Sequence, residues 1–539
     1  MNKFKNSIKP ASKWIGRNRN EFLLLSIILI IGAVLRLNKI SEYMTFLGDE
    51  GRDAIIVRRL LVNFDPILIG PGTSIGNIYL GPLYYYLSAP FLFLANYSPV
   101  GPSVMVALFG IATIFLVWYL GRVWFGKSAS LVASLLYALT PVIIIYSRSS
   151  WNPNIMPFFA LVTVLSLWKI WKDGTYKWFI VLGLSFAFVL QSHYLGLLLI
   201  PTIIVFLFLS FYQLKKENDS KNSSAVREFN IKKKSFFKNL IFGGLVFAFL
   251  MSPLLIFDIR HNWINFNAMK IFFSQRETTV SILPWKSFPN LFPIIGNDVS
   301  TRIVSGTNVY AGKFSTYVLI SFFAVFFTAI IFKFKKIIFD SDNRENFYKG
   351  ILLLIFWIGF GLVGLGLYKQ HLYDHYFGFM FPAIFLFIGA IYQKIHDYNS
   401  EGLKILITAW VIMLIGSYVV NSPLRGSPNF QMHRAKDAAK FIRSDAAGEK
   451  FNLAVIAEQN YEDGYQYFLE KDGANVIDID AQKLNDTIGQ YLYVVCEIPD
   501  EKCDPTHSAK AEVANFGWSK IENKWSISGV VIYKLAHSN

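Results

Sequence analysis

FLLLSIILIIGAVLRLN, at residues 22–38, is an apolar stretch close to the length of about 20 residues that an α-helix needs to cross a lipid bilayer. Similar stretches recur along the chain to about residue 422 and then cease. Hydrophobic residues make up 53% of the 539 residues, and the mean hydropathy is +0.39. Because soluble domains hold only about 45–50% apolar residues, this composition indicates a membrane protein. We therefore predict a polytopic α-helical membrane body, residues 1–424, followed by a soluble C-terminal domain, residues 425–539.

The first apolar stretch is not followed by a small-residue cleavage site, and Arg36 and Lys39 lie at its end. We therefore interpret it as an uncleaved membrane helix and not as a signal peptide. Counting the equivalent stretches predicts about eleven transmembrane helices. We place them at residues 22–38, 102–121, 128–146, 154–171, 178–194, 195–212, 239–257, 315–332, 350–368, 376–393 and 403–421.

The formal net charge of +16 comes from 52 lysines and arginines against 36 aspartates and glutamates. These basic residues gather in alternate loops between the apolar stretches, which the positive-inside rule assigns to the cytoplasm. We predict a multi-pass protein of the plasma (inner) membrane, with a cytoplasmic N-terminus, an extracytoplasmic C-terminal domain and no nucleic-acid partner. The cytoplasmic basic residues are Lys3, Lys5, Lys9, Lys13, Arg17, Arg19 and those within residues 122–127, 169–177, 215–238, 333–349 and 394–404.

For two apolar segments, the number of membrane spans is not evident from their length. Residues 178–212 are too long for one membrane helix and short for two, so the polar residues 191–194 are expected to form a tight turn near the outer surface. Residues 78–97 are apolar enough to span, but counting them as a span would place the later lysine-rich loops outside. We therefore predict an interfacial or re-entrant helix there, within an external loop at residues 39–101.

The C-terminal domain combines short β-type runs with helix-like segments, which predicts a small α/β fold. It contains no glycine loop that could cradle a phosphate and no recognisable catalytic motif. Its Cys496 and Cys503 are the two cysteines of the protein, and they either pair with each other outside the cytoplasm or remain free thiols. The runs lie at residues 452–457, 475–479, 491–496 and 529–533, and the helical segments at residues 435–443 and 508–514.

The first external loop contains FLGDEGRD at residues 46–53, which brings three carboxylates close to a membrane surface. Carboxylates there are costly to keep ionised unless they are solvated or paired. In a functional interpretation, Asp49 removes a proton from an acceptor hydroxyl or amine while Glu50 or Arg52 holds it in place. The alternative, which composition alone favours, is a solvated loop that caps a helix beginning near Ala54.

A second polar cluster, Arg260 and His261, lies at the outer end of a predicted span. Guanidinium groups bind phosphate oxygens through paired hydrogen bonds, so this cluster suits a phosphate. The alternative is an interfacial anchor whose charged group extends toward water beside Trp263.

A third cluster lies between two apolar spans at residues 368–376 and holds two of the eight histidines of the protein. A metal site is conceivable, but a third ligand is missing from the cluster. We favour phosphate or sugar binding, and a plain polar turn is the alternative. The residues expected to contact substrate here are Lys369, for a donor phosphate, and His371, Asp374, His375 and Tyr376.

Two weaker groups, Arg148 and His193, are polar side chains at the ends of predicted helices. Each by itself is more often structural than functional. All five groups nevertheless fall on the outer face in the predicted topology. This coincidence favours a single site that they line together.

Three short motifs resemble those of a known superfamily. They are the Asp49–Glu50 acidic pair, the GPLYYY stretch at residues 81–86, and DHYF at residues 374–377 before Pro382. With the topology, this pattern resembles the GT-C-fold integral membrane glycosyltransferases, especially the ArnT-like and protein O-mannosyltransferase-like branch. The resemblance covers nearly the whole membrane region, although each motif is short.

The resemblance implies that a polyprenyl-phosphate-linked sugar is transferred to a lipid, glycan or protein acceptor at the extracytoplasmic face. It implies that Asp49 lies at the reaction centre with Glu50 beside it. From their positions near the acidic pair and in the GPLYYY stretch, Arg52 and Tyr84 are expected to contact substrate. Some members of the wider fold use a divalent metal, so Mg or Mn is compatible with the acidic pair. The chain has Gly81-Pro82 where members often carry two prolines, and no phosphate-binding lysine or arginine aligns. Arg260, His261 and Lys369 are therefore assigned to the donor phosphate from their position.

A transporter or flippase of lipid-linked saccharides is the main alternative. Such proteins usually carry ionisable residues near the bilayer midplane and often contain detectable repeats, whereas the polar groups here cluster at one face without a repeat. A receptor that presents the C-terminal domain does not need eleven spans. A polymerase or ligase acting on lipid-linked sugars is disfavoured by the acidic pair directly after the first helix.

Overall fold

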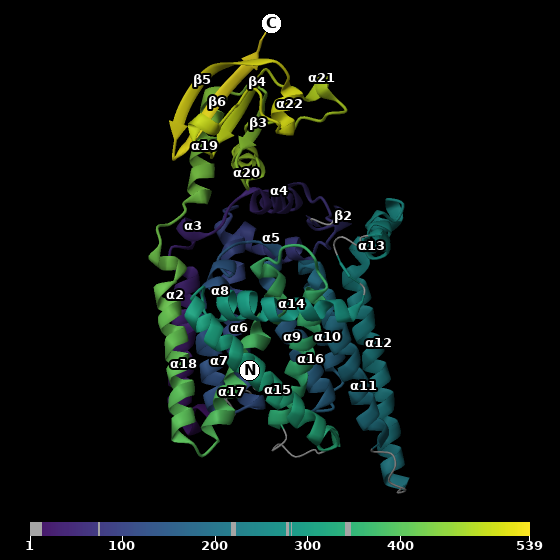
Figure 1. Ribbon diagram of the computed structural model, residues 1–539. Coiled ribbons are helices and arrows are strands. Elements are labelled where there is room, and N and C mark those ends of the chain that lie inside the picture. Colours follow the sequence, from purple (N-terminus) through teal and green to yellow (C-terminus); the bar gives the residue numbers. More distant parts are fainter. Residues whose placement is uncertain are drawn as a thin grey trace.

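The computed structural model describes residues 13–73, 76–216, 223–275, 280–281, 283–339 and 346–538. A bundle of helices forms the body of the molecule, and a small sheet stands beyond one of its ends (Figure 1). The expected cytoplasmic residues Lys3, Lys5 and Lys9 lie outside the described residues.

Within the described residues, nine helices are long and apolar enough to cross a membrane. They match nine of the predicted spans in order, and short helical turns extend four of them at residues 152–155, 194–199, 374–380 and 423–425. The nine are α2 (Arg19–Leu37), α6 (Val100–Trp124), α9 (Met156–Trp171), α11 (Ile200–Lys216), α12 (Ser223–Arg260), α15 (Val309–Phe339), α16 (Asn346–Gly366), α17 (Phe381–His396) and α18 (Glu401–Val420).

The other two predicted spans are shorter apolar helices. One is divided by Pro141 into α7 (Lys127–Leu139) and α8 (Pro141–Tyr146), because proline fits the first turn of a helix better than its interior. The other is α10 (Trp178–Ser192), which packs between α9 and α12 and ends where His193 becomes extended. The turn predicted within residues 191–194 is confirmed.

The segment predicted as the first external loop folds into α3 (Ile40–Tyr43), α4 (Gly48–Asn63), a hairpin of β1 (Gly72–Thr73) and β2 (Gly76–Tyr79), and α5 (Leu83–Leu94). Helix α5 occupies the segment predicted as an interfacial or re-entrant helix, and α4 lies across the end of the bundle beneath the sheet (Figure 1). The expected start of a helix near Ala54 is wrong. Helix α4 begins at Gly48, because acidic side chains in a first turn interact favourably with the helix dipole and with its free N–H groups.

The C-terminal region forms a four-stranded sheet in the order β3-β4-β6-β5. Strands β3 and β4 are parallel, and the other two pairs are antiparallel. Helices α19 and α20 connect this region to the bundle side, as Figure 1 shows. The elements are α19 (Gln431–Ala446), β3 (Phe451–Ile456), α20 (Asp463–Lys471), α21 (Leu484–Thr487), β4 (Tyr491–Cys496), α22 (Ala511–Phe516), β5 (Ser519–Ile527) and β6 (Val530–His537).

Two details of the sheet differ from the prediction. The run at residues 475–479 is not a strand, since only Val476 forms a single bridge with Phe451. Strand β5 was not predicted, because it lies at the edge of the sheet and is largely exposed. An exposed edge strand lacks the apolar alternation that identifies a half-buried strand.

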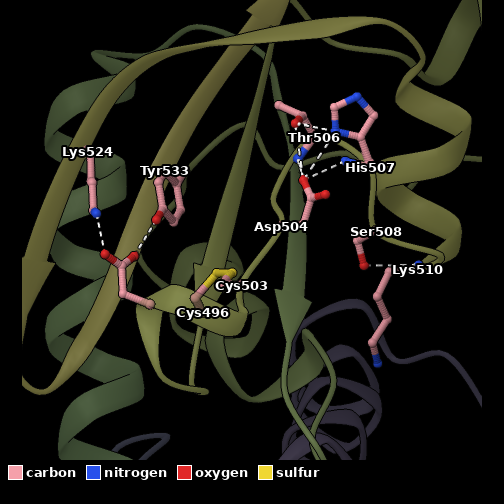
Figure 2. The surroundings of a disulfide bond; sticks show 10 residues. Cys496, Cys503, Asp504, Thr506, His507, Ser508, Lys510, Lys524 and Tyr533 are labelled. Atoms are coloured by element: carbon pink, nitrogen blue, oxygen red, sulfur yellow. Dashed lines mark hydrogen bonds and ion pairs between the residues drawn. A yellow bond between two sulfur atoms is a disulfide. The ribbon is translucent and has the colours of Figure 1, made fainter.

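Cys496 and Cys503 are joined by a disulfide (Figure 2). The bond ties the end of β4 to the segment after the short helical turn η9 (Asp500–Lys502), and the two Cα atoms lie 6.3 Å apart. Of the two alternatives for the thiols, the structure therefore shows the paired one.

Candidate active site

The start of helix α4 is held in place by contacts with the C-terminal region. Phe46 is buried against the rings of Tyr467 and Phe468, with centroid distances of 6.4 and 5.6 Å. The backbone N–H of Gly48 donates to the Asn460 side-chain oxygen at 2.8 Å. The first turn of α4, which carries the acidic residues, is therefore fixed at the junction between the bundle and the sheet region.

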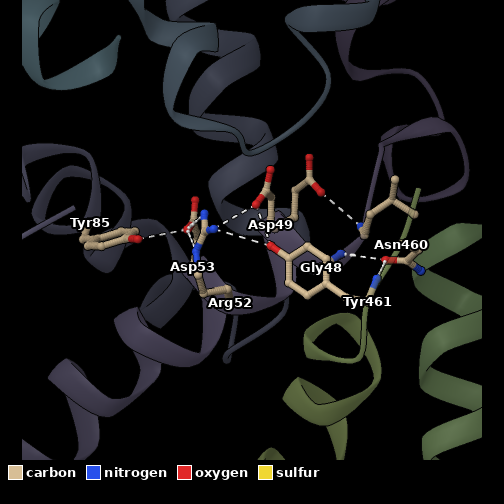
Figure 3. Close-up of polar contacts among 9 residues, drawn as sticks. Gly48, Asp49, Arg52, Asp53, Tyr85, Asn460 and Tyr461 are labelled. Carbon is tan, nitrogen blue, oxygen red and sulfur yellow. Dashed lines mark hydrogen bonds and ion pairs between the residues drawn. The ribbon is translucent and has the colours of Figure 1, made fainter. Parts of the chain in front are cut away.

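Asp49 is the acidic residue with an accessible carboxylate, and its side chain is 42% exposed. Its Oδ1 accepts hydrogen bonds from Arg52 Nη1 at 2.8 Å and from the Tyr461 hydroxyl at 2.5 Å (Figure 3). Its Oδ2 accepts no hydrogen bond from any residue that the structure describes. One oxygen is thus held in place, and the other is available to a substrate.

Arg52 bridges Asp49 and the buried Asp53. Its Nη2 lies 2.8 Å from Asp53 Oδ1, which also accepts the Tyr85 hydroxyl at 3.0 Å (Figure 3). Burial raises the pKa of Asp53 to about 6, although the Arg52 guanidinium opposes the shift. Arg52 is therefore oriented by two carboxylates, and its role within the cluster is to hold Asp49.

Glu50 turns back toward the start of α4. Its Oε2 accepts the backbone N–H of Leu47 at 3.0 Å, and only 6% of the residue is exposed. Burial raises the pKa of Glu50 to about 7, and the nearby Asp49 adds to the shift. Glu50 therefore has the geometry of a helix-capping residue whose proton is retained nearly to neutral pH.

A cavity of about 460 Å³ opens beside Asp49 and Arg52 on the bundle side. Its wall is rich in aromatic rings that come from three stretches of the chain, residues 146–151, 193–194 and 373–376. The His375 ring contacts the rings of Trp151 and His193, with centroid distances of 4.6 and 5.6 Å. We name this the bundle cavity; its aromatic lining is Tyr146, Trp151, His193, Tyr194, Tyr373, His375 and Tyr376.

A second cavity, of about 380 Å³, lies on the other side of Asp49, between the bundle and the C-terminal region. Asp49, Tyr146 and Trp151 line both cavities. We name this the upper cavity; its remaining lining is Thr45, Leu47, Gly48, Glu50, Ile145, Ser149, Asn154, Gln459 and Tyr461. Asp49 therefore faces two spaces that could hold two different molecules.

An apolar groove of about 460 Å³ runs between α15, α16 and α17. Met380 lines this groove, while His375 and Tyr376 line the bundle cavity. All three belong to the helical turn η7 (Asp374–Met380). One short segment therefore connects an apolar surface between the membrane helices with the bundle cavity beside Asp49.

Several predicted site residues lie outside both cavities. Arg148 is buried and donates to the backbone oxygens of Leu35 and Asn38 at 2.6 and 2.7 Å, so it fixes the end of α2. Tyr84 is buried within α5. Arg260 and His261 are exposed at the end of α12, where the His261 ring stacks on Phe257.

The loop at residues 369–375 is fixed by a residue that the sequence did not single out. Arg302, in the π-helical segment η5 (Ile294–Val304), binds Asp374 through Nε at 2.8 Å and Asp298 through Nη1 at 2.8 Å. Asp374 thus serves as an anchor next to His375. Lys369 and His371 lie exposed in the same loop.

Tyr461 was also missed, because a single tyrosine between two polar residues carries no recognisable pattern. Tyr146 and Trp151, which line both cavities, were likewise not selected. In the part of the chain that the structure describes, no three His, Cys, Asp or Glu side chains converge as metal ligands.

The fold and the site define a polytopic membrane protein with an accessible carboxylate at one end of its bundle, beneath a C-terminal sheet region. Residues 80–219, about a quarter of the chain, match the model of the dolichyl-phosphate-mannose-protein mannosyltransferase family. The protein named "Putative mannosyltransferase YycA" of Bacillus subtilis (strain 168) is 26% identical over 141 residues. That alignment covers 25% of this chain and 20% of the relative, so the chain matches about a fifth of the relative's length.

Two solved structures share the fold over almost the whole chain. ArnT from Cupriavidus metallidurans bound to undecaprenyl phosphate is 12% identical with a TM-score of 0.57, covering 97% of this chain and 98% of ArnT. The archaeal oligosaccharyltransferase AglB from Archaeoglobus fulgidus, in complex with an inhibitory peptide and a dolichol-phosphate, is 14% identical with a TM-score of 0.51, covering 91% of this chain and 70% of AglB. The chain is a GT-C-fold membrane protein similar to the ArnT-like and protein O-mannosyltransferase-like glycosyltransferases.

Proposed function

We propose that the chain is a membrane glycosyltransferase that moves a sugar from a polyprenyl-phosphate donor to a lipid, glycan or protein acceptor at the extracytoplasmic face. The observation that supports the proposal is the hydrogen bonding and the position of the Asp49 carboxylate. One of its oxygens is fixed by Arg52 and Tyr461, the other accepts no hydrogen bond from the described residues, and the residue lines two cavities. A general base must contact the acceptor, from which it takes a proton, while the acceptor attacks the donor sugar. A carboxylate that lines two cavities meets this requirement, because one cavity can hold the acceptor and the other the donor.

In the reaction, an acceptor hydroxyl or amine attacks C1 of the donor sugar. The bond from C1 to the phosphate oxygen breaks, and the bond from the acceptor atom to C1 forms. Asp49 Oδ2 takes the acceptor proton, and the polyprenyl phosphate leaves with the bonding electron pair. Because the phosphate is already a good leaving group, positioning and charge stabilisation are the main tasks of the protein.

The two kinds of cavity suit the two parts of such a donor. Aromatic rings provide flat apolar faces for a sugar, and the bundle cavity has seven residues with such rings or imidazoles. The apolar groove suits a polyprenyl chain, and η7 joins it to the bundle cavity. ArnT, which shares the fold, was solved with undecaprenyl phosphate, which supports a lipid phosphate as the donor carrier.

The acceptor is assigned to the upper cavity and the donor phosphate to the rim of the bundle cavity. Lys369 and His371 belong to the loop that supplies Tyr373 to the bundle cavity. In this proposal they bind the donor phosphate. Arg260 and His261 have no part in this assignment, because neither lines a cavity beside Asp49.

Replacing Asp49 tests the proposal. We expect Asp49→Asn to lower kcat for transfer from a radiolabelled polyprenyl-phosphate sugar pool by about 10²–10⁴-fold, the usual contribution of a general base. The matched control is Asp173→Asn, which alters a carboxylate paired with Lys169 at 2.8 Å, away from both cavities. This control should transfer sugar like the wild type, provided that both variants insert normally.

Two results would count against the proposal. Undiminished transfer by Asp49→Asn would remove Asp49 from the chemistry. Absence of transfer by the wild type with every lipid-linked donor tested would contradict the glycosyltransferase itself.

A further inference from the structure

We propose that Tyr461, in the C-terminal region, is a positioning residue for Asp49, so that the catalytic base is complete only when this region is docked on α4. The inference rests on the proposed function of Asp49. It assigns to the C-terminal region a part in the reaction that its sequence did not indicate.

The hydrogen bonds around the Tyr461 hydroxyl give it one orientation. Arg52 Nη1 donates to the Tyr461 oxygen at 3.4 Å, and the Tyr461 hydroxyl donates to Asp49 Oδ1 at 2.5 Å (Figure 3). Because the guanidinium can only donate, the tyrosine must direct its own proton at the carboxylate. Asp49 Oδ1 therefore receives two donors from two different parts of the chain, which fixes the plane of the carboxylate.

Tyr461 is itself held by the residue before it. Asn460 Oδ1 accepts the backbone N–H groups of Gly48 and Tyr461 at 2.8 and 2.9 Å. Asn460 Nδ2 donates to Glu497 Oε1 at 2.7 Å, and that oxygen also accepts the Tyr465 hydroxyl at 2.5 Å. Asn460 is buried, so this network of hydrogen bonds connects the sheet region directly to the first turn of α4.

The disulfide of the sheet region lies next to this network of hydrogen bonds. Glu497 follows Cys496 in the chain, and Cys496 is joined to Cys503 (Figure 2). The ring of Tyr461 packs against the Cα of Gly48, since a Cβ at Gly48 would lie 2.4 Å from the ring atoms. Packing and hydrogen bonding therefore both place the Tyr461 hydroxyl beside Asp49.

Loss of this hydroxyl leaves Arg52 as the single donor to Asp49 among the described residues. Arg52 is shared with Asp53, which is buried and receives two of its hydrogen bonds. The Asp49 carboxylate would then be held by one donor in place of two and could sample more orientations. A base that samples several orientations is aligned with the acceptor in only a fraction of the complexes, so kcat falls while substrate binding is retained.

The test is Tyr461→Phe, which removes the hydroxyl and keeps the ring that packs on Gly48. We expect kcat to fall by about 10- to 100-fold, as for the loss of a hydrogen bond to a charged group, with the KM values of donor and acceptor within about twofold of the wild type. The matched control is Tyr493→Phe, which removes a hydroxyl that donates to Asp445 at 2.5 Å elsewhere in the sheet region. The control should keep the wild-type kcat.

A double-variant comparison separates positioning from folding. In the Asp49→Asn background, Tyr461→Phe should lower the residual transfer by less than twofold, because its effect acts through Asp49. Full kcat in Tyr461→Phe, or an equal loss with and without Asp49, would overturn the inference while leaving the proposed function intact.

A second readout does not depend on activity. Modification of Asp49 by a water-soluble carbodiimide, followed by mass spectrometry, should be faster in Tyr461→Phe than in the wild type and in Tyr493→Phe. Equal rates in all three proteins would overturn the inference. If the wild type transfers no sugar, the proposed function fails separately, and the carbodiimide result still decides whether Tyr461 holds Asp49.

Discussion

Three carboxylates and one guanidinium occupy the first six residues of α4, and their environments differ. Asp49 is accessible, whereas Glu50 and Asp53 are buried. Burial disfavours the charged form of a carboxylate, so the two buried residues retain protons to higher pH. Asp49 is therefore the carboxylate suited to chemistry, whereas Glu50 holds the start of the helix and Asp53 holds Arg52.

The titration of Glu50 gives a prediction for stability at this scale. Its pKa is raised from the ordinary value of about 4.5 to about 7 in the folded protein. A raised carboxyl pKa stabilises the folded state fully below pH 4.5, and this stabilisation is lost as the pH rises through 7. The wild type should therefore lose free energy of unfolding, on the order of 3 kcal/mol from this group, between about pH 4.5 and pH 8.

Glu50→Gln isolates this effect, because glutamine can still accept the Leu47 N–H but does not titrate. We expect the melting temperature of Glu50→Gln to fall less than that of the wild type between pH 5 and pH 8, measured in lipid nanodiscs. The raised pKa of Asp53 also lowers the stability of both proteins as the pH rises. This contribution is the same in the two proteins, so it cancels when their melting temperatures are compared. Parallel melting curves for the two proteins across this range would contradict the prediction.

At the scale of elements, α4 and α20 approach so closely that their contact requires glycine. A Cβ at Gly51 would lie 2.3 Å from the backbone nitrogen of Gly464 and 2.4 Å from the carbonyl of Asp463. These are backbone atoms, which cannot move aside as a flexible side chain can. The docking of the sheet region on the helix that carries Asp49 thus depends on a residue without a side chain.

Gly51→Ala should therefore destabilise the docked arrangement by about 1–3 kcal/mol, although alanine favours a helix more than glycine does. We expect faster proteolysis in the chain that leads to α19 and lower transfer activity. The control is Gly416→Ala in α18, where an added Cβ meets nothing within 4 Å. That substitution should leave both readouts unchanged; equal behaviour of the two variants would argue against the glycine contact.

At the scale of the whole molecule, the site lies at the end of the bundle that bears the sheet region (Figure 1). The positive-inside rule assigns the lysine-rich loops to the cytoplasm. If the proposed orientation holds, the C-terminal region and Asp49 both face the extracytoplasmic side. In the proposed function, the lipid-linked sugar would approach Asp49 laterally through the apolar groove between α15, α16 and α17.

Cysteine labelling tests this orientation. Lys520→Cys, on exposed strand β5, should react with a membrane-impermeant maleimide in intact cells. Lys177→Cys, in the exposed loop before α10, should react only after the membrane is permeabilised. The native cysteines do not interfere while they remain paired. Labelling of Lys177→Cys alone in intact cells would reverse the proposed topology.

The sequence by itself determined the membrane body, the order of its helices and the region in which the acidic site lies. These features depend on the length of apolar stretches and on the position of charges between them, both of which are local properties. The same reasoning identified Asp49, His193, His375 and Tyr376, which the structure brings to one cavity. It missed the start of α4 at Gly48, because composition alone favoured a solvated loop before Ala54.

Only the tertiary structure decided what surrounds Asp49. Its second hydrogen-bond donor, Tyr461, lies 412 residues away in the chain, and no local pattern relates the two. Likewise, Arg148 was predicted as a site residue, but the fold uses its guanidinium to hold the end of α2. The hydrophobic effect that places helices in a bilayer is independent of direction, whereas a hydrogen bond requires particular atoms at a particular distance and angle. Such geometry exists only after the bundle and the sheet region have packed together.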